Sequence, residues 1–570
     1  MKEEKKLHLA RLGLSVLSAW ILTSNLFGTW LHLDSPTHGG TVSLLGFAAV
    51  LIGITGLFFW LLSHVKKQGT GLLFWSCYGA GVLWAMSAGD VWFAVGLAML
   101  FLLALRQWEP TGLLRWGPGE KSVRRTYAIC FFLLSGWIGL VTVCRYLVFR
   151  APCFDMGIFS QMFESMRRTG APVTTCERNL ALSHFQVHTS PIFYVLLPLY
   201  AIWPSPVTLQ IGQALVTASG LIPLYFLCRR HRLDAAATLF LAVAYLLFPA
   251  LSGSCFYDLH ENCFLAPCLL WVVYGMTAKK TWVLALSAVA TLAIKEDAGI
   301  YLAFLGLYFW MGEKRRKTGL LLFFVSVVAF GAATWYLSRY GDGILSSRFD
   351  NLLYEPGGSM IQIIKTVLIH PAYALRECFT VEKIQYLLLL LLPFGGLLVC
   401  KTPPARYLLL GPMLLLNVMP DYEYLHTINY QYNFGTTVLL FYFVILQLSG
   451  LDQRRQRAQA LGAVLLSGLL FAGTKAGFGW YMEDYLQNSN TYQQMEEDLD
   501  RIPADASVTA STYLVAHLYE HEELYQTDSG IRSQYLAIDL RWEDSSAEKL
   551  KETGYELIYQ SDALAIYRRN

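Results

Sequence analysis

The sequence has little charge. Only 15% of its 570 residues are Asp, Glu, Lys or Arg, whereas about a quarter of an ordinary soluble domain is charged. The missing charge is replaced by repeated apolar blocks, and 55% of all residues are hydrophobic. A formal net charge of +3 without a basic stripe gives no sign of nucleic-acid binding. The composition therefore predicts a polytopic membrane protein.

Paired cysteines and nucleotide-binding motifs are also missing. The 11 cysteines are scattered without a CxxC pair, so neither a zinc site nor a redox site is indicated. The C-terminal portion contains no GxGxxG motif and no P-loop, so nucleotide binding has no support there. Cys153 and Cys176 fall in one polar segment. Whether they pair stays open, because spacing alone does not fix connectivity.

What the sequence does have is a long series of apolar segments. A spanning helix needs about 20 apolar residues, although shorter or broken helices occur inside bundles. About fifteen spans are expected, at residues 9–27, 42–62, 72–86, 91–105, 127–148, 208–228, 236–251, 264–276, 283–294, 298–310, 319–337, 384–399, 407–419, 434–448 and 460–473. The fold class expected is therefore an all-α membrane bundle.

Lysine and arginine clusters fall in every second loop. By the positive-inside rule this places the N-terminus in the cytoplasm and, with an odd number of spans, the C-terminus outside the plasma membrane. The alternation holds only if 188–203 is an interfacial helix and 283–310 is two short spans. The loops expected outside are the long ones, 149–207, 252–263, 338–383 and 420–433. Their length indicates that the function faces outward.

The chain divides by composition into three parts. Residues 1–125 read as an added four-helix membrane unit, and residues 126–479 as the main transmembrane module. Residues 480–570 are richer in charge and alternate strand-like with helix-like runs. The strand-like runs are 507–510, 535–540, 556–559 and 564–567; the helix-like runs are 481–501, 512–519 and 545–553. This pattern predicts a small extracytoplasmic α/β domain.

The segment 151–194 organises the predicted outer face. It begins with the single acid Asp155 and carries several basic residues and histidines. Apolar residues between Phe154 and Met166 recur at helical spacing, which predicts an amphipathic helix in the membrane interface. Asp155 could also be a helix N-cap, because Asp is favoured at that position.

Three further polar clusters lie in predicted outer loops. They are Tyr257–Asn262, Lys295–Asp297 and the tyrosine-rich run Asp421–Tyr432. Carboxylates can deprotonate a hydroxyl or bind a divalent cation, and cations can neutralise a phosphate leaving group. Each cluster also has a simpler interpretation: a solvated loop end, a structural ion pair, or an aromatic belt. Their occurrence on one side favours a shared site that transfers a group from a lipid phosphate to an outside acceptor.

The sequence resembles a family of bacterial and archaeal polytopic membrane proteins of unassigned function. The resemblance runs in order from about residue 127 to the C-terminus. It is carried by FDMGIFSQ at 154–161, HF at 184–185, SP at 190–191, LPLY at 197–200, YDLHE at 257–261, IKED at 294–297, RIPADASV at 501–508, HL at 517–518 and YLAID at 535–539. That family is grouped with the GT-C glycosyltransferases, membrane enzymes that use polyprenyl-phosphate-linked sugars. The resemblance implies a GT-C-like bundle with its site on the outer face.

The resemblance also implies roles for individual residues. Asp155 is expected to be the base, in the role that an acid of the first outer loop has in these enzymes. The expected catalytic residues are Asp155, Glu261 and His260; those binding the donor phosphate are Lys295, Arg178 and His184; those binding substrate are Asp258, Glu296, Asp297, Gln161 and Tyr257. A divalent cation (Mg or Mn) held by Asp155 and His260 stays open, because Met156 stands where a second acid is often found in the superfamily.

The expected function is therefore transfer of a hexosyl or pentosyl group from a polyprenyl-phosphate donor. The acceptor would be a glycan, lipid or protein of the cell envelope, and the enzyme would contact membrane lipids. A transporter or lipid flippase is the main alternative, but it calls for mid-span ionisable groups and pseudo-symmetric halves, which the sequence does not show. A non-catalytic scaffold that binds through the α/β domain is another.

Overall fold

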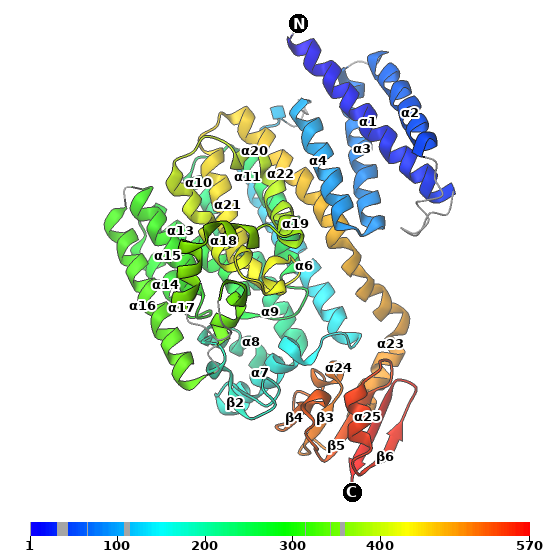
Figure 1. The fold of residues 1–570 in the computed structure, drawn as a ribbon, viewed down its shortest axis with the longest axis vertical. Helices are drawn as coiled ribbons and strands as arrows, with labels where there is room; N and C mark the ends of the chain where they lie inside the picture. The colour runs from blue at the N-terminus through cyan, green and yellow to red at the C-terminus, as the bar shows by residue number, and fades with distance from the viewer. Residues whose placement is uncertain are drawn as a thin grey trace.

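The computed structural model describes residues 2–30, 44–64, 67–107, 114–313, 315–341, 344–353 and 360–570. The predicted span 42–62 and the predicted loop 338–383 lie partly outside these residues, as does part of the predicted unit 1–125. The described chain is a helical bundle with a small sheet at one end (Figure 1).

Eight helices of the described chain are long and apolar enough to cross a membrane. They are Leu45–His64, Glu120–Leu147, Pro206–Arg230, Ala235–Gly253, Arg316–Tyr340, Val381–Leu398, Gln431–Leu448 and Gln453–Thr474. Four shorter apolar helices accompany them, at Arg11–Thr23, Val91–Leu105, Thr281–Leu292 and Ala298–Met311. The all-α bundle is as predicted. Fewer than the expected fifteen segments are long helices in the described chain, because some consist of short or irregular helical turns. The predicted span 407–419, for example, contains a 3₁₀ helix followed by a π-helix.

The helices form two groups before the C-terminal sheet. The first group is α1 (Lys2–Trp30), α2 (Leu44–His64), α3 (Lys67–Ala88) and α4 (Val91–Gln107). The second group is α6 (Glu120–Leu147), α7 (Ile158–Thr169), α8 (Leu197–Ile202), α9 (Pro206–Ser219), α10 (Leu221–Arg230), α11 (Ala235–Leu246), α12 (Pro249–Gly253), α13 (Leu265–Ala278), α14 (Thr281–Leu292), α15 (Ala298–Met311), α16 (Arg316–Tyr340), α17 (Met360–Ile369), α18 (Pro371–Glu377), α19 (Val381–Leu391), α20 (Gly395–Leu398), α21 (Phe434–Leu448) and α22 (Gln453–Thr474). In Figure 1 the first group lies to one side, with α3 and α4 against α22.

The helices α14 and α15 are separate, as the loop alternation predicted. The break between them contains Lys295, Glu296 and Asp297. Helix α15 packs along α16 over much of its length, with Gly306 and Gly319 at the contact. A Cβ on Gly319 would lie 2.6 Å from the backbone nitrogen of Trp310, so only glycine permits this approach. The close pairing of α15 with α16 fixes the turn that carries Lys295.

The C-terminal region contains a five-stranded mixed sheet in the order β4-β3-β5-β7-β6. It follows α23 (Trp480–Leu499) and is built from β3 (Val508–Ala510), α24 (Thr512–Val515), β4 (Leu524–Gln526), β5 (Tyr535–Asp539), α25 (Ser545–Lys551), β6 (Tyr555–Gln560) and β7 (Leu564–Arg569). The strands β4, β3 and β5 are parallel, and β5, β7 and β6 are antiparallel. All four strand-like runs are confirmed as strands. The short strand β4 was not predicted.

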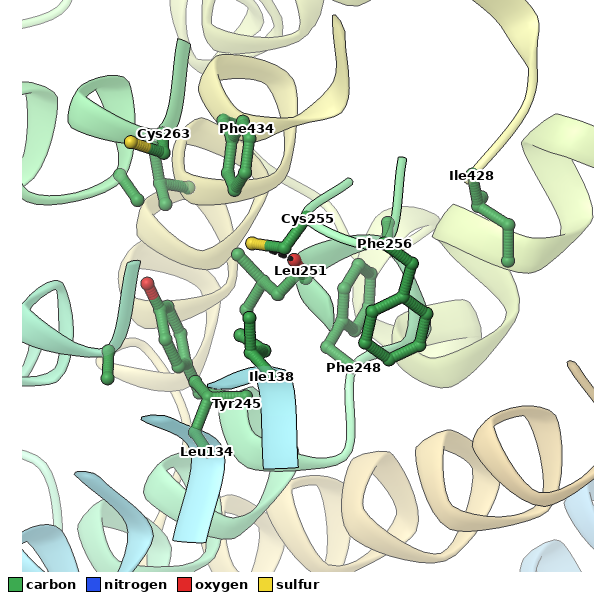
Figure 2. Packing of buried hydrophobic residues seen from close by; sticks show 14 of the residues in the cluster. Leu134, Ile138, Tyr245, Phe248, Leu251, Cys255, Phe256, Cys263, Ile428 and Phe434 are labelled. Carbon is green, nitrogen blue, oxygen red and sulfur yellow. Dashed lines mark hydrogen bonds between the residues drawn. The ribbon is translucent and has the colours of Figure 1, made fainter. Parts of the chain in front are cut away.

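One large apolar core runs through the bundle. Figure 2 shows part of it, where Leu134, Ile138, Tyr245 and Phe248 pack together. Cys255, Phe256 and Cys263 belong to this core and flank the polar turn at 257–262. The turn is therefore anchored at both ends by buried side chains.

Candidate functional site

Asp155 lies in a tight turn between α6 and α7. Its backbone has φ 63° and ψ −70°, a combination that a non-glycine residue rarely adopts. Helix α7 begins two residues beyond Met156 without any side-chain cap, so Asp155 is not an N-cap. Within the described residues its carboxylate accepts no hydrogen bond. Strained backbone of this kind is held by the surrounding structure and is found most often at functional sites.

The surroundings of Asp155 are dominated by other ionisable groups. Burial raises the pKa of its carboxyl well above the usual range, and the nearby carboxylates of Glu261 and Asp258 raise it further. The Lys295 ammonium acts in the opposite direction. Residues far apart in the sequence are thus brought to one place, as the outer-loop clusters predicted.

Asp258 is held by two side chains from the bundle. Arg145, near the end of α6, donates to its Oδ2 at 2.5 Å, and Gln210 of α9 donates to its Oδ1 at 2.7 Å. Arg145 also donates to the carbonyl of Tyr257, and its guanidinium lies 5.5 Å from the Tyr257 ring centroid. Burial nevertheless raises the pKa of Asp258 to about 6. The turn that bears Asp258 is thereby fixed to α6 and α9.

Glu261 forms an ion pair with Lys295, with Nζ 2.9 Å from Oε1. Its other oxygen lies 3.2 Å from Nδ1 of His260. Both members of the ion pair are almost fully buried. The pKa of Lys295 is raised because Glu261 and its neighbouring acids outweigh the cost of burial. Lys295 therefore remains a cation. The ion pair that the simpler interpretation of the Lys295–Asp297 cluster expected is present, with Glu261 as the partner.

Three histidines adjoin this pair, and two of them are held neutral. Burial lowers the pKa of His260 and of His188 well below the usual value, and the charge of Lys295 lowers both further. His188 Nδ1 lies 3.0 Å from Glu296, and His184 Nδ1 lies 2.9 Å from Glu177. The second ring nitrogen of His184 is buried and has no protein partner in the described chain.

A second cation, Arg348, completes the cluster. Its guanidinium lies 5.7 Å from the ring centroid of Tyr422 and 5.2 Å from that of Tyr432. Burial opposes its charge, but Tyr432, Asp297 and Glu296 raise its pKa. The tyrosine-rich loop thus contributes rings to the cluster in addition to any role as an aromatic belt. The arrangement places an unpaired carboxylate beside the cation Lys295, with Arg348 near His260 and His188 in the same cluster, which suits proton removal and anion stabilisation.

The sequence profile of a family described as "Predicted membrane protein (DUF2079)" matches residues 145–558. The chain belongs to this family. No curated protein matches the chain. Among solved structures, the fold is similar to that of ArnT from Cupriavidus metallidurans bound to undecaprenyl phosphate: identity is 11%, 79% of this chain and 98% of that chain are covered, and the TM-score is 0.49. ArnT in the apo state matches with 12% identity, 72% and 92% coverage and a TM-score of 0.40.

Of two other expected site residues of this DUF2079 protein, Gln161 makes its side-chain hydrogen bonds away from the Asp155 cluster, whereas Arg178 lies within electrostatic reach of His188 in that cluster. Gln161 accepts from Thr175 N at 2.8 Å and donates to the carbonyls of His521 and Glu522 at 3.0 and 3.1 Å. Its amide thus joins α7 to the C-terminal region, and its role in substrate binding stays a prediction. Arg178 is exposed and donates to the carbonyl of Glu177.

Several residues of the cluster were missed from the sequence: Arg145, Glu177, Gln210 and Arg348. Arg145 carried a usable signal, because a charged residue near the end of an apolar span is costly unless it has a partner. Glu177 and Arg348 lie in polar or mixed segments where nothing distinguishes them from solvated neighbours, and Gln210 is an uncharged residue inside the predicted span 208–228.

The residues do not form an obvious metal site. In the described part of the chain no three His, Cys, Asp or Glu side chains are arranged to hold an ion. Asp155 and His260 therefore have no third ligand of these types among the described residues. The thiols of Cys153 and Cys176 are free and buried, and the Cys176 thiol donates to the carbonyl of Leu524 at 3.4 Å.

Proposed function

We propose that this DUF2079 protein is a membrane glycosyltransferase. It would transfer a hexosyl or pentosyl group from a polyprenyl-phosphate donor to an acceptor hydroxyl on the outer face of the plasma membrane. One observation carries the proposal: Asp155 is a carboxylate without a hydrogen-bond partner in the described chain, held in strained backbone beside the cation Lys295.

The reaction follows from the charges of the cluster. Asp155 accepts the proton of the acceptor hydroxyl, and the hydroxyl oxygen attacks the anomeric carbon of the donor sugar. The bond between that carbon and the phosphate oxygen breaks in line. Lys295 and Arg348 stabilise the negative charge on the departing lipid phosphate. Both cations keep their charge because neighbouring acids or phenols raise their pKa values.

Other residues of the cluster have supporting roles. The neutral imidazole of His260 and the Glu261 carboxylate orient the sugar. His260 contacts Glu261, and Glu261 is paired with Lys295. His184, whose second ring nitrogen is buried and has no protein partner in the described chain, would bind the donor phosphate. Asp258, Glu296 and Asp297 hold the cations and histidines in position. A raised pKa makes Asp155 a stronger base once it is ionised.

The orientation in the membrane belongs to the same proposal. The N-terminus would lie in the cytoplasm, residues 126–479 would form the catalytic module, and residues 480–570 would lie outside as a separate α/β domain. The Asp155 cluster would then open where lipid-linked sugars are displayed.

The experiment is to incubate purified protein with labelled polyprenyl-phosphate sugars and an extract of cell-envelope glycans. Label is expected to leave the lipid and to appear in a new product. Asp155→Asn is expected to lower the rate by about 10²- to 10⁴-fold. The matched control is Asp562→Asn, which removes an exposed acid of the C-terminal region. Label that stays on the lipid would contradict the proposal. If the protein in lipid vesicles moves this labelled lipid from one leaflet to the other, it is a flippase.

A further inference from the structure

An open apolar groove of about 340 Å³ lies between α6 and α10. Both helices belong to segments long enough to cross a membrane, Glu120–Leu147 and Pro206–Arg230. Three apolar side chains in the groove are exposed: Phe132 by 69%, Ile222 by 49% and Phe226 by 39%. Buried Tyr127 and Leu221 lie beneath them. On a membrane-spanning surface, a hollow lined in this way faces lipid tails.

The groove is preformed and runs along the helix axis. The hydroxyl of Tyr127 donates to the carbonyl of Thr238 at 3.2 Å, and its ring lies edge-to-face against Tyr225 with centroids 5.3 Å apart. Arg124 and Phe132, at opposite ends of the groove on α6, are separated by a rise of about 12 Å. Half the thickness of a bilayer core is about 15 Å. The groove therefore matches most of one acyl chain in one leaflet.

One end of the groove, which we call its mouth, is positively charged. Arg124 lines the groove there, and its side chain is 70% exposed. Its Nε lies 3.4 Å from Oε1 of Glu120, and Nη2 of Arg229 lies 3.4 Å from the other oxygen of the same carboxylate. Two guanidiniums thus share one carboxylate. Lys121 is exposed three positions before Arg124, on the same side of α6, and adds a further positive charge.

The contacts at the mouth leave Arg124 able to take another anion. Both ion pairs are longer than the 2.7–2.9 Å that is typical of a charge-assisted hydrogen bond. Exposed pairs of this kind contribute little to stability, so exchanging one for another anion costs little. The hydroxyl of Tyr225 accepts from Nε of Arg124 at 3.2 Å and donates to Glu120, which keeps the guanidinium at the groove. A guanidinium presents a planar set of donors that matches phosphate.

The headgroup decides which lipid such a groove prefers. The tail gains little from leaving bulk lipid for an apolar groove, because lipid tails are as apolar as the protein surface. The excess of positive charge at the mouth favours an anionic headgroup and repels the cationic part of a zwitterionic one. Basic pockets between membrane-spanning helices are known to bind anionic headgroups in this way.

We propose that the groove between α6 and α10 binds an anionic diacyl phospholipid of the phosphatidylglycerol type. One acyl chain lies in the groove and the phosphate lies at Arg124, with Lys121 and Arg229 beside it. The basic clusters at 121–125 and 229–232 are among those that predict the cytoplasmic side, so the lipid comes from the cytoplasmic leaflet. This site does not depend on the proposed transferase.

The test is native mass spectrometry of the purified full-length protein, released from a neutral detergent. The probes are phosphatidylglycerol and phosphatidylcholine with the same acyl chains, supplied in equal amounts. Phosphatidylglycerol is expected to be the lipid that stays bound. Arg124→Gln should weaken its binding by about 5-fold, the effect of one basic residue at an anionic headgroup.

Matched variants locate the site on α6. Arg125→Gln removes an exposed arginine that does not line the groove, and this variant should bind as the wild type does. Ala128→Trp fills the groove from an exposed position and should lose the bound lipid, whereas Ile129→Trp, outside the groove, should keep it. The unfolding temperatures of all four variants in lipid-free detergent should stay close to the wild-type value, because the altered side chains are exposed.

Three results would overturn the proposal. Equal retention of the two phospholipids by the wild type would show that the groove has no headgroup preference. Equal loss of phosphatidylglycerol by Arg124→Gln and Arg125→Gln, or by Ala128→Trp and Ile129→Trp, would place the lipid elsewhere. Displacement of phosphatidylglycerol by an equal amount of polyprenyl phosphate would show that the groove prefers an isoprenoid lipid to a diacyl phospholipid.

Discussion

Lys295 and Glu261 form a buried ion pair, with Nζ 2.9 Å from Oε1, although one lies between α14 and α15 and the other in the turn before α13. This contact joins the two polar turns that face Asp155. It also supplies a cation that stays charged inside the protein. The stability of the pair and its chemistry can be tested separately.

Lys295→Met leaves the Glu261 carboxylate buried without its counter-charge. Breaking a buried pair in this way costs about 3–5 kcal/mol, so the unfolding temperature should fall clearly. The double variant Lys295→Met/Glu261→Gln removes both charges and should recover most of that stability. Its transfer activity should stay lost, because no ammonium faces the leaving phosphate. If the double variant regains transfer activity along with stability, the Lys295–Glu261 pair has only a structural role.

Asp258 should make stability depend on pH in a defined window. Its pKa rises from 3.8 to about 6 in the folded protein. The folded state therefore binds the proton more tightly than the unfolded state. The contribution of Asp258 to the free energy of unfolding is fully present below about pH 4. It falls by about 3 kcal/mol as the pH rises through 6.

The measurement is chemical unfolding of wild type and Asp258→Asn at pH values from 4 to 8. The difference in unfolding free energy between the two proteins should shift in favour of Asp258→Asn as pH rises. Titrating groups that do not interact with Asp258 cancel in this comparison, whereas Asp155, whose pKa Asp258 raises, contributes to the difference. A difference that does not change with pH would contradict the raised pKa.

Gln161 should matter for the C-terminal region rather than for transfer. Gln161→Leu removes the bonds to the carbonyls of His521 and Glu522. Each buried group left unpaired costs about 1–3 kcal/mol. Limited proteolysis should therefore cut near residues 520–525 faster than in the wild type. Unchanged cleavage there, with a loss of donor binding instead, would show that Gln161 belongs to the substrate site.

The orientation of the chain can be tested with single introduced cysteines. All 11 native cysteines are buried or half-buried, so they should react little with a membrane-impermeant maleimide. Asp562→Cys should be labelled on intact cells, and Lys121→Cys only after the cells are broken. Both positions are exposed. The reverse pattern would place the Asp155 cluster on the cytoplasmic side and rule out the proposed donor face.

Much of the bundle and part of the site could be predicted from the sequence. Loop alternation separated α14 from α15, and the polar turns at 257–261 and 295–297 do meet near Asp155. Arg348 and Gln210 could not be assigned, because their roles arise only when distant segments pack together. The contacts of Gln161 could not be assigned for a related reason: helical spacing shows that a face of α7 is buried, but not which part of the chain covers it.

The rate of sugar transfer by Asp155→Asn across the pH range tests the central claim most directly. For the wild type, the rate should rise with pH as Asp155 loses its proton, at a pH above the ordinary range for an aspartate because burial raises its pKa. For Asp155→Asn the rate should be about 10²- to 10⁴-fold lower and should lack this rise. A variant that keeps the wild-type rate and the same pH profile would show that Asp155 is not the base.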